Sequence, residues 1–400
     1  MIFSFKDKFF PYYAWQTVTV LEKAAGWWPF QNRTKNMTLR LMHFGNLLLI
    51  IIMCSVRLFQ EYKQKKLYIV VENTVILVMI ICTKMKVIMF FINEKQRKIF
   101  YENVLIHWKD TNDEEEMMIL KQYAKLGLKT IINYAIFLVS VNILFQGVPV
   151  LSDVINYLND PNITYLKKEL PIYIEVYIDQ EKYFYQLYVV LFFMTCAALL
   201  LAFSHELTFF QSVQHINAMF KIIEIRIIRL SKIVKRTECG LDTFKEADRK
   251  IFVCISRAVD LHNAVLNNIK FINSSFGATY LVVLLFNCLI FGASLFLIFN
   301  NSDQKIHLIR YGLVFLGLSV HFFIIFWPGQ KIMDGSESLF NVCCSCDWYK
   351  LSKRSKNLLR IMMLKSVMQC QITASGMFVL SFETYVKLFK TGLSFVAVFS

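Results

Sequence analysis

The stretch TYLVVLLFNCLIFGASLFLIF, residues 279–299, decides the fold class because it carries no charged side chain. A helix needs about 20 mostly apolar residues to cross a bilayer. The whole chain agrees, since 56% of its 400 residues are hydrophobic, 18% are charged and the mean hydropathy is +0.46. A soluble domain has about 25% charged residues. Because backbone polar groups must be hydrogen-bonded inside a bilayer, the sequence predicts an all-α polytopic membrane protein.

Apolar segments long enough to be transmembrane helices recur along the chain. The seven predicted spans lie at 41–58, 67–92, 128–151, 185–203, 279–299, 308–327 and 377–399. The last is the weakest because it contains Glu383, Lys387 and Lys390. Without a linker-like or repetitive segment between the spans, the chain is expected to form a single seven-helix membrane domain over residues 1–400.

Lysine and arginine set the expected orientation, because cytoplasmic loops of membrane proteins are enriched in them. Of the 44 basic residues, 33 fall in the segments expected inside, counting the span ends beside them, and 7 fall in those expected outside. The inside segments are 1–40, 93–127, 206–276 and 328–366. The basic EYKQKK loop at 61–66 is the exception. The N-terminus is therefore expected in the cytoplasm and the C-terminus outside.

The net charge of +15 is explained by these loops. Basic cytoplasmic loops face anionic lipid, so membrane lipid rather than nucleic acid is the expected partner. Residues 212–236 and 244–272 carry apolar residues at helical spacing between charges. The spans are therefore expected to continue into a cytoplasmic helical bundle over 206–276 and 328–366. Thr111 and Glu114 have the spacing of a capping box, which predicts a helix start there.

The loop expected outside, 152–184, contains the sequon Asn162-Ile163-Thr164, so Asn162 is a candidate glycosylation site. None of the ten cysteines falls in an outer loop, which excludes an extracellular disulfide. The cluster CCSC at 343–346 is too tightly bunched to close a tetrahedral metal site alone. Motifs of hydrolases, nucleotide-binding proteins and potassium channels are missing, so neither an enzyme nor a cofactor is expected.

The C-terminal quarter, from WPGQKIMDGSES to YVKLFKTGLSFVAVFS, closely resembles the tail of insect odorant receptors. The residues that carry this resemblance are Gly329, Ser336, Trp348–Tyr349, Ser381, Glu383–Thr384–Tyr385 and Ser394–Phe395. It extends to 170–190, to 262–276 and to AAGWWPF at 24–30, similar to the Gly-x-Trp-Pro stretch before the family's first helix. The two tryptophans also suit a belt at the membrane interface.

The resemblance implies an odorant-gated, non-selective cation channel in the plasma membrane, expected in olfactory sensory neuron dendrites. It would form a heterotetramer with the odorant receptor co-receptor, bind small volatile odorants, and line its pore with the seventh helix. The ligand pocket is implied in the outer half of the bundle. In the family this is the outer half of the second, third, fourth and sixth helices. The candidate ligand-binding residues there are Phe145, Gln146, Tyr188, Phe192 and Tyr311.

The pore residues are expected in the last helix. By position, Val398 matches the family's hydrophobic constriction, and Ser394 and Phe395 match a small polar and aromatic pair below it. Independently, Glu383, Lys387 and Lys390 share one helical face, and ionisable groups in a span usually face protein or water. The alternative is an ion pair at a subunit contact, with Lys390 extending to the interface.

Three other classes remain as alternatives. A gustatory receptor channel would share the fold, but Thr391–Gly392 stand where that family has Gln-Phe. A G-protein-coupled receptor would have the opposite orientation, and the seventh span lacks a proline. A transporter or membrane enzyme would need charged or metal-binding constellations inside the spans.

Overall fold

The computed structural model describes residues 12–65, 67–159, 170–238, 244–300 and 305–399. Its elements, in chain order, are α1 (Tyr13–Ala25), α2 (Arg33–Lys63), α3 (Leu67–Ile92), α4 (Glu94–Asp110), α5 (Glu114–Asn159), α6 (Phe184–Glu238), α7 (Phe244–Asn300), α8 (Lys305–Ser345), the 3-10 turn η1 (Trp348–Lys350), α9 (Lys353–Ser366), β1 (Thr373–Ala374), β2 (Phe378–Val379) and α10 (Phe382–Phe399). The two short strands pair as an antiparallel hairpin. Candidate glycosylation site Asn162 lies outside the described residues.

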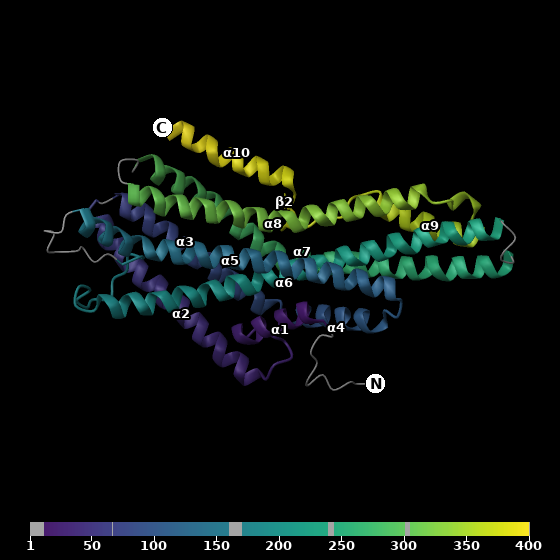
Figure 1. The fold of residues 1–400 in the computed structure, drawn as a ribbon, viewed down its shortest axis with the longest axis horizontal. Coiled ribbons are helices and arrows are strands. Elements are labelled where there is room, and N and C mark those ends of the chain that lie inside the picture. Colours follow the sequence, from purple (N-terminus) through teal and green to yellow (C-terminus); the bar gives the residue numbers. More distant parts are fainter. Residues whose placement is uncertain (1–11, 66, 160–169, 239–243, 301–304, 400) are drawn as a thin grey trace.

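Four long helices, α5 to α8, run along the long axis of the molecule (Figure 1). The 55 residues of α6 give a helix about 80 Å long, which is more than twice the roughly 30 Å hydrocarbon thickness of a bilayer. Within the described residues, six helices are long and apolar enough to cross a membrane, namely α2, α3 and α5 to α8. The prediction of an all-α polytopic membrane fold is confirmed.

The last helix begins later than the sequence suggests. Helix α10 starts at Phe382, whereas residues 377–381 belong to the hairpin and the residues that follow it. The hairpin turn has positive φ at Ser375 (51°) and Gly376 (74°), and the backbone N–H of Met377 donates to the carbonyl of Ala374. Two consecutive positive φ angles are typical of a tight hairpin turn and interrupt a helix. A membrane crossing by α10 stays a prediction.

Residues 25–28 of the N-terminal stretch AAGWWPF lie in the protein core. Trp27 and Trp28 are buried, so the interpretation as an interfacial belt is wrong. Gly26, at φ 75°, ends α1 in the left-handed region that favours glycine. The carboxylate of Glu22 in α1 accepts hydrogen bonds from Arg97 and Thr208, among others, which ties α1 to α4 and α6.

The start of α5 also differs from the prediction. The cap is Asp113, whose Oδ1 accepts from the backbone N–H groups of Glu115 (2.9 Å) and Glu116 (3.3 Å). Thr111 instead donates its hydroxyl to the carbonyl of His107 at the end of α4. The predicted Thr111–Glu114 capping box is therefore wrong, because an aspartate one position before the helix is an equally good cap.

The C-terminal motif residues hold the hairpin against α7 and α8. A Cβ atom at Gly329 in α8 would overlap the carbonyl oxygen of Leu380. Ser336, two turns further along α8, accepts from the backbone N–H of Cys370 at 3.0 Å. Asn273 in α7 accepts from the N–H of Thr373 at 2.9 Å. These contacts fix where α10 starts.

We expect Gly329→Ala to destabilise the protein by about 1–3 kcal/mol, because the added methyl group must push the hairpin away from α8. The measurement is the thermal unfolding midpoint of the purified full chain in detergent. Gly312→Ala is the matched control in the same helix, because a Cβ there meets no atom within 4 Å. Equal midpoints for both variants would contradict this packing account.

Candidate ligand cavity and pore helix

A cavity of about 270 Å³ lies among α3, α5, α6, α7 and α8. Its volume is close to the lower end of the roughly 300–1,000 Å³ typical of small-molecule pockets. Most of its lining is aliphatic or aromatic, including Ile76, Ile80, Leu138, Phe145, Ile172, Leu199, Val283 and Leu318. Such a surface favours small apolar molecules through shape and dispersion.

The cavity also reaches a buried ion pair. The ammonium of Lys86 in α3 lies 2.7 Å from a carboxylate oxygen of Glu206 in α6, and both side chains are almost fully buried. Tyr280 of α7 donates its hydroxyl to the other oxygen of Glu206 at 2.9 Å. Lys86 lines the cavity. The carboxylate of Glu206 therefore joins α3, α6 and α7 beside the cavity.

A second polar contact lies in the cavity lining. The hydroxyl of Tyr134 in α5 is 2.6 Å from Nδ1 of His321 in α8, and both residues line the cavity. None of Lys86, Glu206, Tyr134 and His321 was among the residues predicted for the site. For Lys86 a signal existed, since an ionisable residue inside a predicted span marks a functional position.

Three of the five predicted ligand-binding residues meet on one side of the cavity. Phe145 lines it directly. Gln146 donates through Nε2 to Oγ1 of Thr195, a lining residue, at 2.9 Å. Tyr188 donates to the carbonyl of Gln146 at 2.7 Å. Phe145 therefore belongs to the cavity wall, and Gln146 and Tyr188 lie behind it, bonded to that wall through Thr195. Ligand contact by these residues stays a prediction.

The other two predicted residues lie apart from this cavity. Tyr311 lines a separate void of about 10 Å³, together with Phe145, and donates to Glu72 at 2.8 Å. Arg310 pairs with the same carboxylate at 2.7 Å. Phe192 lines neither of these two cavities. Its backbone carbonyl accepts a hydrogen bond from the hydroxyl of Thr195 at 2.9 Å.

Helix α10 lies at the edge of the bundle beside α8 (Figure 1). One face packs inward, where Gly392 allows the ring of Phe291 in α7 to approach so closely that a Cβ would lie 2.5 Å from it. On the uncovered side, Lys387 and Glu383 form an ion pair of 2.6 Å, with side chains 71% and 77% exposed. Lys390 and Ser394 are exposed as well.

Glu383 and Lys387 thus share a face, form an ion pair and point away from the subunit core. The assignment of this face to the pore or to a subunit contact stays a prediction. Ser394 donates its hydroxyl to the carbonyl of Lys390 at 2.9 Å, which satisfies it within its own helix. The side chains of Phe395 and Val398 lie outside the described part of the chain. Their assignment to a constriction stays a prediction.

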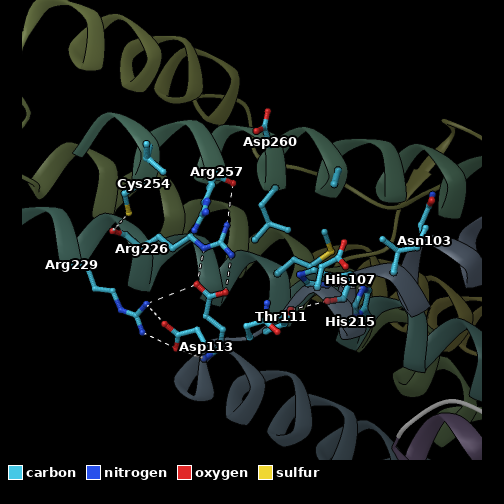
Figure 2. Close-up of a pocket in the computed structure, with 18 of the residues that line it drawn as sticks. Asn103, His107, Thr111, Asp113, His215, Arg226, Arg229, Cys254, Arg257 and Asp260 are labelled. Atoms are coloured by element: carbon cyan, nitrogen blue, oxygen red, sulfur yellow. Dashed lines mark hydrogen bonds and ion pairs between the residues drawn. The ribbon is translucent and has the colours of Figure 1, made fainter. Parts of the chain in front are cut away.

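A larger cavity of about 1190 Å³ lies at the opposite end of the bundle, where α4, α5, α6 and α7 meet (Figure 2). Arg226 of α6 makes two hydrogen bonds of 2.7 Å to the carboxylate of Glu116 in α5. Arg229, one turn on, pairs with Asp113 at 2.6 Å and lowers the pKa of Asp113 to about 2. These pairs fasten the start of α5 to α6.

Two histidines line the same cavity. Nδ1 of His107 lies 3.4 Å from Nε2 of His215. Burial lowers the pKa of His107 to about 4, so both rings are expected to be neutral at pH 7. In the described ranges no group of three or more His, Cys, Asp or Glu side chains is placed to hold a metal ion. The ion pairs here act as structural ties between helices.

We expect Lys86→Met to destabilise the protein by about 3–5 kcal/mol, because it leaves the buried Glu206 carboxylate without its counter-charge. The double variant Lys86→Met/Glu206→Gln removes both charges and should recover most of the loss. The thermal unfolding midpoint of the purified chain measures both effects. A double variant as unstable as the single one would show that the unpaired charge is not the cause.

Comparisons with known proteins agree with this architecture. The family model described as 7tm Odorant receptor matches residues 68–392. The solved structure of the insect olfactory receptor OR5 from Machilis hrabei in complex with eugenol aligns with a TM-score of 0.73 at 11% identity, over 96% of each chain. The structure of the same receptor described without eugenol aligns with a TM-score of 0.73 at 10% identity and the same coverage.

Among curated proteins no sequence matches the chain. The likeness to the solved receptors establishes a common fold, and the family model covers most of the chain, including the cavity and the start of α10. An odorant-receptor family model points to a receptor rather than to an enzyme. The chain therefore belongs to the 7tm Odorant receptor family.

Proposed function

We propose that this chain is the odorant-binding subunit of a heteromeric, non-selective cation channel assembled with the odorant receptor co-receptor. The cavity among α3, α5, α6, α7 and α8 is the odorant site, and the observation that carries the proposal is this largely apolar space. Its aliphatic and aromatic lining suits small volatile molecules, which have few hydrogen-bonding groups. Eugenol, the ligand in the solved complex of the Machilis receptor, is a small molecule of this kind.

Pore formation by α10 is the second part of the proposal. One face of α10 packs against its own subunit and the other is uncovered. A pore-lining helix needs both faces, because its outer face packs on the subunit and its inner face borders the central pore. In that arrangement the Glu383–Lys387 pair faces the last helices of the other subunits across the pore axis. An apolar constriction near Val398 would close the pore by excluding water.

Assembly is proposed to use the bundle of α4 to α9 at the end that the charge distribution predicts to be cytoplasmic. The same reasoning gives an inside N-terminus, an outside C-terminus and a place in the plasma membrane of olfactory sensory neuron dendrites. Long helices continue from the cavity into this bundle, so contacts between subunits there hold the ligand-binding parts in a fixed arrangement.

A gustatory receptor channel remains the closest alternative by fold, but the match is to the odorant receptor model, and Thr391–Gly392 depart from the gustatory pattern. A G-protein-coupled receptor is disfavoured by the same match. The two channel classes differ in a measurable way, because a gustatory-type channel would not need the odorant receptor co-receptor.

We expect odorant-evoked cation current only in cells that express this chain together with the co-receptor, recorded with guanine-nucleotide signalling blocked. The comparison cells express this chain alone or the co-receptor alone, with surface expression verified. Current from this chain alone would favour a self-sufficient channel. Loss of the current when nucleotide signalling is blocked would contradict a directly gated pore.

A further inference from the structure

One side chain of the cavity has hydrogen-bonding capacity that the protein does not use. Asn287 in α7 is 4% exposed and lines the cavity. Its side-chain nitrogen has no hydrogen-bond partner in the part of the chain that the structure describes. Buried donors are nearly always bonded, because an unsatisfied one loses its hydrogen bonds to water without replacement. An unused donor on a side chain that lines a cavity therefore indicates a ligand that supplies an acceptor.

Most other polar groups of the lining already have hydrogen-bond partners within the protein. The hydroxyl of Thr83 donates to the carbonyl of Met79 at 3.1 Å, and that of Thr195 to the carbonyl of Phe192 at 2.9 Å. Both threonines are thus satisfied by their own helices.

Tyr134 and His321 bond to each other, and Asn142 accepts from Nε2 of Gln146 at 3.2 Å. Asn142 and His321 are only half-buried. Among the fully buried lining residues that the structure describes, donor capacity therefore remains at Asn287 and at Lys86, whose ammonium has three N–H groups and bonds to Glu206.

The charges of the cavity favour a neutral ligand. Lys86 is balanced by Glu206, and Tyr280 donates to the same carboxylate. A ligand carboxylate would have to displace Glu206 from Lys86 or remain an unpaired buried charge, and either costs several kcal/mol. A neutral carbonyl or ether oxygen meets the free donor without disturbing this pair.

The position of Asn287 on α7 also puts it in the apolar part of the cavity. Asn287 follows Tyr280 and Val283 on one face of α7 at helical spacing, and Val283 lines the cavity. It therefore lies about two turns from the ion pair that Tyr280 contacts. A molecule bonded at Asn287 has aliphatic and aromatic side chains around the rest of its surface.

We infer that the cavity selects neutral, mostly apolar molecules with one hydrogen-bond acceptor, such as ketones, esters or ethers, and that Asn287 is the residue that donates to that acceptor. This inference rests on the proposed function, since it assigns a ligand class to the proposed odorant site. It makes Asn287 a specificity-determining residue rather than a packing residue.

The test uses the full chain co-expressed with the co-receptor and a panel of straight-chain alkanes, methyl ketones, methyl esters and carboxylic acids of matched length. The wild-type complex should respond to ketones and esters at lower concentrations than to alkanes or acids. Asn287→Leu, similar in size but without the donor, should raise the half-maximal concentration for ketones and esters about three- to tenfold, the net worth of one neutral hydrogen bond. Alkane responses should not weaken.

Two further variants separate this effect from misfolding. Thr83→Val removes a lining hydroxyl that is already bonded within its helix, so it should leave the ketone preference unchanged. Asn287→Ser keeps a small donor and should retain part of the preference. Surface expression and the alkane response report whether each complex is folded.

The outcomes distinguish the inference from the proposed function. Equal responses to alkanes and ketones in the wild type, a preference that survives Asn287→Leu, or acids as the best agonists would overturn the ligand class while leaving an odorant-gated channel. No current with any compound from a wild-type complex confirmed at the surface would overturn the proposed function, and the ligand class with it.

Discussion

The rest of the structure depends on one constraint, the need to satisfy every backbone polar group inside a bilayer. It requires each span to be a helix, and here α5 to α8 do not stop at the membrane boundary but continue into the opposite end of the bundle (Figure 1). The walls of the cavity among α3, α5, α6, α7 and α8 and the ion-paired bundle are therefore parts of the same helices. A change in helix position at the cavity has a continuous rigid element through which to reach the bundle.

Buried ion pairs determine how these helices are aligned with one another. Lys86–Glu206 joins α3 to α6, Arg310–Glu72 joins α8 to α3, and Arg97–Glu22 joins α4 to α1. Dispersion between apolar helices is similar in many alignments, whereas an unpaired buried charge costs several kcal/mol. The pairs thus disfavour shifted alignments. The cavity lies beside one of them, so its shape follows from the alignment they fix.

Helix positions were predictable from the sequence, because long apolar runs and charged loops directly reflect the bilayer. Local details depended on competition between similar residues: Asp113 caps α5 in place of Thr111, and the turn at Gly376 delays α10 to Phe382. The cavity was only partly predictable, since its lining depends on how each helix is rotated. Phe145 was found, Lys86 had a usable signal, and Asn287 had none, because an isolated asparagine in an apolar span does not reveal its neighbours.

The central claim, that odorants act from the cavity among α3, α5, α6, α7 and α8, is tested most directly by filling it. Ala198 lines the cavity, and its neighbour Ala197 in the same helix does not. In cells that also express the co-receptor, Ala198→Phe should abolish the odorant-evoked current while the complex remains at the surface, and Ala197→Phe should leave the current largely intact. An undiminished odorant response in Ala198→Phe would contradict the account, because the site would then lie elsewhere.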